Sequence, residues 1–206
     1  MAAAGWPVEL RDGDVGLRPL RLRDAAVWCE VRRRNEQWLA PWEGRPPASA
    51  PQPWQDRHTT AAYTLMARVH RREAREGRAL PFAVTVKGQL AGQVTVSGIV
   101  RGAFQSGSVG YWVDEREAGR GVVTTAVALA IDHCFGPVGL HRVEANVRPE
   151  NAPSLRVVDK LGMRPEGRRE RMLFIDEQWR DHLAFALTVD DQPEGVLRRL
   201  RSRHTG

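Results

Sequence analysis

The chain has 206 residues, a formal net charge of +6, 27% charged residues and 42% hydrophobic residues. This length fits one well-packed domain, because two halves would each lie near the lower size limit for a stable core. The composition is that of a folded globular protein rather than a disordered or membrane one. The sequence has no apolar run of about 18 residues and no basic-then-hydrophobic leader, so we expect a cytoplasmic protein without membrane contact.

The basic charge comes almost entirely from arginine, with lysine only at Lys87 and Lys160. The arginines are spread along the chain rather than gathered in one block, which argues against a nucleic-acid surface. The two cysteines, Cys29 and Cys134, lie far apart in the sequence in apolar, helix-like segments. We therefore expect buried free thiols and no metal site.

The first part of the chain predicts a strand pair followed by a helix. Residues 8–24 alternate apolar and polar side chains around a turn at Asp12 and Gly13, which indicates two short strands or one bent strand. Asp24 is expected to cap a helix that continues to Val31. The next segment, residues 41–53, carries five prolines and is expected to form a surface loop.

The middle of the chain predicts a helix and then a hairpin. Residues 54–76 repeat apolar side chains at helical spacing, with Gly77 as the stop. Residues 80–100 hold two β-branched runs divided by Lys87 and Gly88, which is a hairpin signal.

Beyond the hairpin, strands and helices alternate. Residues 122–134 are apolar nearly all round and predict a helix buried against a sheet. The other expected elements are strands at 106–115 and 141–147, a helix at 151–162 capped by Asn151 and ended by Gly162, a terminal hairpin at 172–189, and a basic tail at 191–206 that is helical or frayed. This order predicts an α+β sheet with helices on its faces.

A glycine turn, REAGRGVVT, precedes the apolar helix and suggests a phosphate site. A P-loop would need a lysine and a hydroxyl residue after Gly121, but two valines follow it. In a dinucleotide-binding fingerprint the first glycine directly follows a strand. Here a charged segment separates Val113, at the end of the expected strand, from Gly119, so dinucleotide binding stays only an alternative. The third interpretation is R-x-x-G-x-G, in which backbone amides and a helix N-terminus cradle a pyrophosphate. A connection that binds nothing is the remaining alternative.

Residues 109–130 and 140–167 together resemble the GCN5-related N-acetyltransferase (GNAT) superfamily, in its RimJ/RimL branch, which acetylates the N-termini of ribosomal proteins. The resemblance implies the GNAT fold, a mostly antiparallel mixed sheet with helices on both faces and a splayed strand pair at the acetyl-CoA site. It makes residues 1–190 a single N-acetyltransferase domain and acetyl-CoA the co-substrate. By resemblance, Val113 hydrogen-bonds the pantetheine, and the pyrophosphate is held by Arg116, Gly119, Arg120, Gly121, Val122, Val123 and Thr124.

The same resemblance gives roles to the segment PENAPSLRVVDKLG. Asn151 would contact CoA and Ser154 would lie near the thioester sulfur, where its hydroxyl would hydrogen-bond the departing thiolate. From the residues alone, Asn151 is equally well explained as a helix cap.

Acetyl transfer to an amine also needs a proton acceptor and an oxyanion donor. We expect Glu144 to be the base, on a strand face shared with Arg142 and Asn146. A structural ion pair of Glu144 with Arg142 or Arg148 is the alternative, and in some relatives the catalytic glutamate stands at the position of Asn146. The oxyanion donor is expected to be an amide near the end of the 109–113 strand.

The acceptor side is less defined. By resemblance, the proline-rich loop flanks the acceptor, with Glu43 attracting an ammonium group and with Trp42, Tyr111 and Asn146 beside it. A loop simply packed by its tryptophans is the alternative. The leading hypothesis is acetylation of a protein N-terminus. A small amine such as an antibiotic or polyamine is the second acceptor class, and a non-catalytic acetyl-CoA or RNA-binding module is the third hypothesis.

Overall fold

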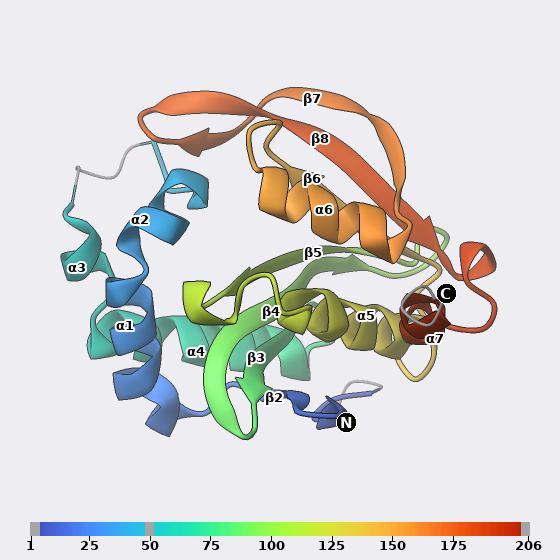
Figure 1. Ribbon diagram of the computed structural model, residues 1–206, viewed down its shortest axis with the longest axis horizontal. Helices are drawn as coiled ribbons and strands as arrows, with labels where there is room; N and C mark the ends of the chain where they lie inside the picture. The colour runs from blue at the N-terminus through green and yellow to red at the C-terminus, as the bar shows by residue number, and fades with distance from the viewer. Residues whose placement is uncertain (1–4, 48–51, 203–206) are drawn as a thin grey trace.

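The protein is an eight-stranded sheet with helices on both faces in a computed structural model that describes residues 5–47 and 52–202 (Figure 1). The strands are β1 (Leu10–Asp12), β2 (Val15–Pro19), β3 (Leu80–Val86), β4 (Gln89–Val100), β5 (Ser106–Val113), β6 (Arg142–Val147), β7 (Arg164–Ile175) and β8 (Gln178–Thr188). The strand order is β1-β2-β3-β4-β5-β6-β8-β7, and among these described strands only β5 and β6 pair in parallel. This arrangement confirms the predicted α+β class and the mostly antiparallel mixed sheet.

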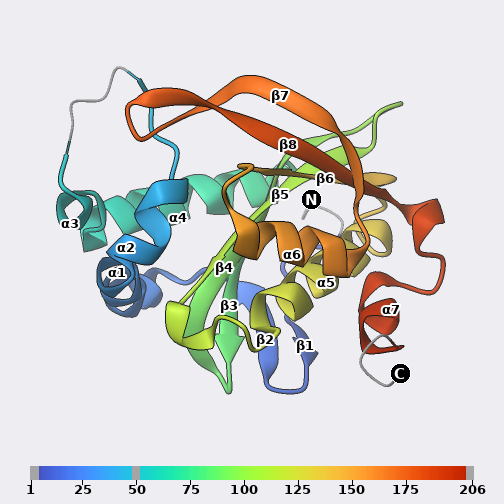
Figure 2. The same cartoon turned by 45° about the horizontal axis from the view of Figure 1, so that its top comes forward.

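Helices cover the two faces in two groups. The helical segments are η1 (Leu22–Asp24), α1 (Ala25–Arg34), α2 (Glu36–Leu39), η2 (Ala40–Trp42), α3 (Trp54–Arg57), α4 (Thr60–Arg75), η3 (Glu115–Glu117), α5 (Val122–Phe135), α6 (Ala152–Leu161), η4 (Val189–Asp191) and α7 (Val196–Ser202). Phe82 and Val84 of β3 pack in the core cluster of α5, whereas Ala83 between them packs with α1 and α4. Strand alternation thus places apolar side chains on both faces, and each face is covered (Figure 2).

The predicted local signals formed as expected at several places. The β3–β4 hairpin turns at Lys87 and Gly88, which both have positive φ, as two-residue hairpin turns require. Asn151 caps α6 through its side-chain oxygen, which accepts a 3.1 Å hydrogen bond from the Ser154 amide, and Gly162 ends that helix with φ +72°.

Three expected elements differ in the structure. The helix predicted over residues 54–76 is divided into α3 and α4, because the Thr59 hydroxyl caps a new helix by accepting from the Ala62 amide at 3.2 Å. Asp24 makes no side-chain cap for α1, since its carboxylate accepts hydrogen bonds from the Arg18 guanidinium at 2.7 and 2.9 Å and from the amide of Arg21, just before η1, at 2.9 Å. β7 begins at Arg164 rather than near residue 172. The sequence pattern does not reveal the first half of this strand, because its residues are exposed on both faces and show no apolar alternation.

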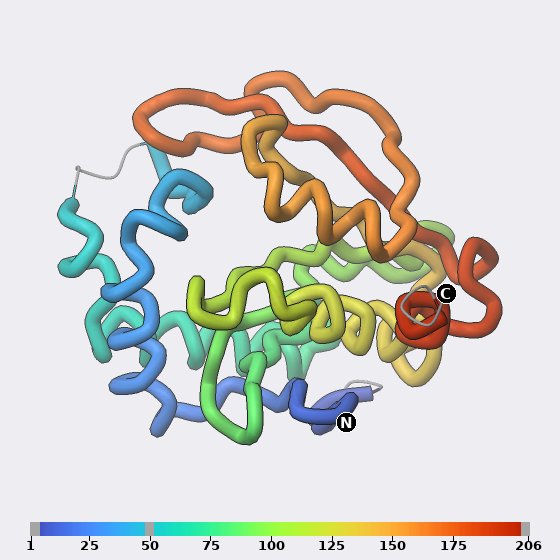
Figure 3. The backbone as a smooth tube through the Cα atoms, in the orientation of Figure 1, coloured from blue at the N-terminus to red at the C-terminus, as the bar shows by residue number. Residues whose placement is uncertain are grey.

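The basic segment after residue 190 follows η4 and forms α7, which packs against α5 (Figure 3). Val196 and Leu200 belong to the same buried cluster as α5. Asp132 of α5 accepts the amides of Val196 and Leu197 at 2.7 and 3.0 Å, which satisfies donors at the start of α7. The expected domain limit at residue 190 stays a prediction. Residues 48–51 of the proline-rich loop and 203–206 of the tail lie outside the described residues.

Candidate acetyl-transfer site

A cavity of about 630 Å³ opens where β5 and β6 part. The two strands are paired only from Ser106 to Ser108 with Arg142 to Glu144, and beyond that register they have no hydrogen bonds to each other. The cavity is lined by the ends of both strands and by α2, η2, α6, β7, β8 and the turn before α5. The splay therefore gives a ligand access to the middle of the sheet from both of its faces.

The glycine turn forms one end of this cavity. Gly119 and Gly121 have φ of +74° and +78°, and a Cβ at either position would meet no atom within 4 Å. Gly121 is the N-cap of α5, so the unpaired amides of the first helical turn face the turn. Val123 and Thr124 line the cavity as well, and these open amides with the helix dipole suit an anionic group.

Three other residues that were expected to hold the pyrophosphate do not line the cavity. Val122 is buried in the core, and Arg120 pairs with Glu117 at 2.6 Å. Neither of them, nor Arg116, is among the residues that line the cavity. Contact between their side chains and a ligand therefore stays a prediction, as does the pyrophosphate contact of Gly119 and Gly121, which do line the cavity.

Helix α6 forms the opposite wall of the cavity. Asn151 and Ser154 line it, together with Arg156 and Lys160 one and two turns along. The Tyr111 hydroxyl of β5 lies 3.4 Å from the Ser154 carbonyl oxygen. Burial raises the pKa of Tyr111 to about 12, although the hydrogen bond to Ser154 lowers it in part, so this phenol is protonated at neutral pH. The wall thus combines hydroxyl groups near the splay with cations farther along the helix.

The third wall is an aromatic and charged cluster around Arg32 of α1 and Glu43, which directly follows η2. Arg32 is buried, forms an ion pair with Glu43, and lies over the rings of Trp28, Trp54 and Trp112 at 5.4, 4.7 and 5.0 Å. Burial lowers the pKa of Arg32 to about 9, and the nearby charge of Arg57 adds to the effect. Arg32 is therefore still a cation at neutral pH.

Comparison with known proteins agrees with this geometry. Residues 14–164 match the family model of the acetyltransferase (GNAT) domain. The [ribosomal protein uS5]-alanine N-acetyltransferase of Escherichia coli is 30% identical over 192 residues, which cover 91% of this chain and 94% of that protein. The probable N-acetyltransferase YjcK of Bacillus subtilis is 40% identical over 105 residues, 50% of this chain and 58% of that protein. The chain belongs to the GNAT acetyltransferase family.

Solved structures place it in the same branch. RimJ of Mycobacterium smegmatis in complex with CoA-disulfide is 40% identical, with a TM-score of 0.93 over 98% of this chain and 97% of that one. The ribosomal-protein-S5-alanine acetyltransferase of Vibrio fischeri is 28% identical, with a TM-score of 0.79 over 89% of this chain and 98% of that one. The GNAT fold and the RimJ-like branch are confirmed, and the donor of this N-acetyltransferase family is acetyl-CoA.

The GNAT resemblance assigned the pantetheine contact to Val113. Val113 does line the cavity, but its carbonyl oxygen accepts a 3.1 Å hydrogen bond from Trp38 Nε1. A pantetheine amide would therefore share or displace this indole donor. Trp42, Glu43 and Asn146, the other expected acceptor contacts, all line the cavity with Tyr111.

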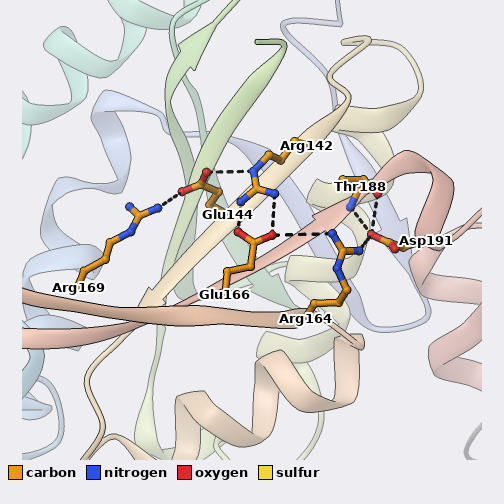
Figure 4. Close-up of polar contacts among 7 residues, drawn as sticks. All are labelled: Arg142, Glu144, Arg164, Glu166, Arg169, Thr188 and Asp191. Atoms are coloured by element: carbon orange, nitrogen blue, oxygen red, sulfur yellow. Dashed lines mark hydrogen bonds and ion pairs between the residues drawn. The ribbon is translucent and has the colours of Figure 1, made fainter.

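Glu144 does not lie as expected. Its carboxylate accepts hydrogen bonds from Arg142 at 3.0 Å and from Arg169 of β7 at 2.7 Å, and it is not among the residues that line the cavity. Figure 4 shows it between Arg169 and Arg142 in a row of alternating charges that continues through Glu166, Arg164 and Asp191. Its next neighbour on that strand face, Asn146, lines the cavity instead. The geometry therefore favours the ion-pair alternative over the role of base.

Replacing Glu144 with glutamine separates the two roles. If the ion pairs are its function, unfolding free energy should fall by about 1 to 3 kcal/mol, the usual effect of losing hydrogen bonds to charged groups, while kcat changes by less than about threefold. Chemical denaturation and steady-state kinetics measure both quantities.

Glu166→Gln is the matched control, because Glu166 pairs with the same Arg142 farther along the row. Both variants should lose similar stability and keep turnover. A loss of turnover in Glu144→Gln alone, with stability intact, would return Glu144 to the role of base.

The side chains of Arg34, Asn35 and Asp114, which hold the loop before α5 in place, gave no signal in the sequence. Asp114 accepts hydrogen bonds from Arg34 and from Asn35 Nδ2, and Asn35 Oδ1 accepts the Glu115 amide at 2.9 Å. Burial by itself raises the pKa of Asp114, but hydrogen bonds from Arg34, Asn35 and the Arg116 amide outweigh burial and lower it. These contacts fasten the end of α1 to the start of the loop. The polar residues lie 79 positions apart, so only the fold brings them together.

Within residues 5–47 and 52–202, no group of three or more histidine, cysteine or acidic side chains is placed to hold a metal ion. The same part of the chain has no helix long and apolar enough to cross a membrane.

Proposed function

We propose that the protein transfers the acetyl group of acetyl-CoA to the N-terminal amine of a protein, with a ribosomal protein as the acceptor class. The observation that carries the proposal is the extent of the similarity to RimJ of M. smegmatis, which covers 98% of this chain. Because so little of the chain is left out, the similarity extends to the acceptor side of the cavity as well as to the CoA side. The name of the E. coli relative, an alanine N-acetyltransferase of ribosomal protein uS5, supports the same acceptor class.

On the donor side, the glycine turn and the first amides of α5 would bind the pyrophosphate of acetyl-CoA. Open space at Gly119 and Gly121 supports this, because a phosphate needs close approach to the backbone. Arg156 and Lys160 add positive charge along the same wall. The pantetheine would then pass between the splayed ends of β5 and β6 and bring the thioester close to Ser154.

On the acceptor side, the amine would enter between η2 and the open face of β6. Trp42 supplies an aromatic surface, Tyr111 reaches the same cavity from the α6 wall, and Asn146 supplies a buried side-chain oxygen that has no hydrogen-bond partner among the described residues. Glu43 would attract the ammonium group, although Arg32 and Arg57 already share its charge. Attraction to Glu43 alone would therefore be weak. A peptide, which can make further polar contacts along its own backbone, would be favoured over a small amine that offers only its positive charge.

The chemistry is a direct attack of the amine on the thioester in a ternary complex. Neither cysteine lines the cavity, and both are buried. Burial raises the pKa of the Cys134 thiol to about 12 and raises that of Cys29 as well. Because the thiolate is the nucleophilic form, neither side chain serves as an acyl carrier at neutral pH. Ser154 would donate a hydrogen bond to the departing thiolate, and a β5 amide at the splay would stabilise the oxyanion.

The test is a panel of acceptors incubated with acetyl-CoA and the purified protein. It contains peptides that begin with alanine, serine or methionine, N-terminally blocked lysine peptides, and small amines such as spermidine and an aminoglycoside. Mass spectrometry locates the acetyl group. We expect acetylation of free peptide N-termini, with alanine-first peptides preferred. Transfer only to small amines, or salt-sensitive RNA binding without transfer, would contradict the proposal.

A further inference from the structure

Attack on the thioester requires an amine without its extra proton, and a protein α-amino group has a pKa of about 7.7 to 8.0. A substantial part of the acceptor therefore arrives as ammonium and must give up a proton in the cavity. Glu144, the residue expected to take that proton, is bound by two arginines outside the cavity lining. Another group has to accept it.

Two of the described side chains that line the cavity can accept a proton at neutral pH. They are Glu43 and His182, since Tyr111 is a protonated phenol and the other titratable lining groups are cations: Arg32, Arg148, Arg156 and Lys160. Glu43 is already shared between Arg32 and Arg57 and lies 3.4 Å from His58 Nε2. Its carboxylate oxygens are therefore already engaged by other side chains and are not free for the amine proton. His182 is the group that remains.

His182 stands on the acceptor face of the sheet. β8 pairs with β6 so that Ala184 lies opposite Asn146. Directly paired residues share a face, and so do alternate residues of one strand. His182 therefore projects on the same side as Asn146, away from the face that packs on α5 and α6. Its side chain is buried from outside solvent, with 3% of the residue exposed, yet it lines the cavity.

The ring of His182 is held in one orientation. Its Nδ1 lies 3.1 Å from the carbonyl oxygen of Arg180, and because a carbonyl only accepts, Nδ1 must donate its proton. In the neutral ring Nε2 then carries an unshared electron pair, and no other described residue hydrogen-bonds to it. A fixed tautomer with a free acceptor nitrogen is the arrangement that a general base requires.

The surroundings keep this ring neutral at physiological pH. Burial lowers the pKa of His182, the Arg180 carbonyl raises it in part, and Arg148 lowers it. The other charged groups near it or across the cavity are Asp181 beside it, Glu150 after β6, Arg169 paired to it on β7, Arg156 and Lys160 of α6, and Arg32 and Glu43 of the third wall. The neutral imidazole is therefore the form ready to take up a proton.

We propose that His182 is the proton acceptor for the amine, and that the unpartnered Oδ1 of Asn146 orients that amine. This inference rests on the proposed function. The ammonium donates one proton to His182 Nε2, directly or through one water, while another N–H donates to Asn146 Oδ1. The amine nitrogen then forms a bond to the thioester carbonyl carbon, and the carbon–sulfur bond breaks. A second proton from the nitrogen leaves with the thiolate as free CoA thiol, and His182 returns its proton to solvent.

The test compares the wild-type protein with His182→Gln, with acetyl-CoA and an alanine-first peptide as substrates, from pH 5 to pH 9. Release of CoA thiol gives kcat, and calorimetry gives the affinity for acetyl-CoA. We expect kcat to fall by about 10²- to 10⁴-fold, with unchanged acetyl-CoA affinity. The acidic limb of the wild-type kcat profile should lie below the usual histidine value of about 6.5 and disappear in the variant. Added imidazole should restore part of the turnover of His182→Ala.

His133→Gln is the matched control. His133 is also buried, and its ring also hydrogen-bonds a backbone carbonyl, that of Gly5, at 2.7 Å, but it lies on α5 and does not line the cavity. Its variant should keep the wild-type pH profile. An acidic limb retained in His182→Gln, or kcat within about threefold of wild type, would overturn the inference.

The outcome for the peptide separates this inference from the proposed function. If the wild-type protein does not acetylate the peptide at any pH, the proposed function fails, and spermidine becomes the acceptor in the same comparison of variants. Loss of the acidic limb with spermidine would then support His182 alone. A wild-type protein that acetylates neither amine would overturn both.

Discussion

Replacing both Gly119 and Gly121 with alanine is expected to raise the KM for acetyl-CoA by about tenfold or more, which corresponds to a loss of about 1.4 kcal/mol of binding free energy. Both glycines have positive φ, a conformation that costs an alanine roughly 1 to 2 kcal/mol. A Cβ at either position would meet nothing within 4 Å, so the penalty comes from the backbone and is relieved by shifting the turn. A shifted turn no longer presents its amides to the pyrophosphate. Calorimetry with acetyl-CoA and steady-state kinetics measure the effect.

The matched control is the double variant Gly102→Ala/Gly139→Ala. These glycines have φ of +72° and +71° and equally open surroundings, but they lie in other loops, outside the cavity lining. The two double variants should lose similar stability in thermal unfolding, while only the variant in the turn before α5 loses acetyl-CoA affinity. Equal affinities in both would refute the pyrophosphate site.

Arg32→Leu is expected to lower the unfolding free energy by about 3 to 5 kcal/mol, the usual cost of breaking a buried ion pair from one side. The substitution leaves Glu43 without its main partner and removes a cation from three tryptophan rings, where each desolvated contact contributes up to about 2 kcal/mol. Because Arg32 and Glu43 both line the cavity, the KM for the peptide should also rise. Chemical denaturation and peptide kinetics measure the two effects.

Two further variants make this prediction specific. Arg198→Leu removes an arginine from an exposed pair with Glu194 on the basic C-terminal segment, and should change stability by no more than about 1 kcal/mol. Arg32→Leu/Glu43→Leu removes both charges, so it should recover much of the stability that the single variant loses. If Arg32→Leu proves as mild as Arg198→Leu, the aromatic cluster does not depend on its cation.

Taken together, the walls of the cavity divide the reaction between the two faces of the sheet. The glycine turn and α6 belong to the face covered by α5, where CoA is proposed to bind, and Trp42, Asn146 and His182 belong to the other side of the splay. The parting of β5 and β6 is the place where both faces open into one space. This division explains why a donor thioester and an acceptor amine can meet without either crossing the core.

The sequence by itself determined the features whose causes lie within a few residues. Lys87 and Gly88 set a hairpin turn, Asn151 caps α6, and Gly119 with Gly121 breaks the chain before an apolar helix that can only be buried. Such signals depend on local backbone preference and on the period of apolar residues. They were enough, with the resemblance they carry, to predict the fold class and the family.

The tertiary structure decided which charged side chains face the cavity. Glu144 could be placed on the correct face of β6 by alternation, but Arg169 comes from β7, 25 residues away, and holds it outside the cavity. Arg32 gains its role from tryptophans on three different segments, and His182 becomes a cavity residue only because β8 pairs with β6. The physical reason is that burial, ion pairing and pKa depend on neighbours that chain folding supplies, and no local pattern records them.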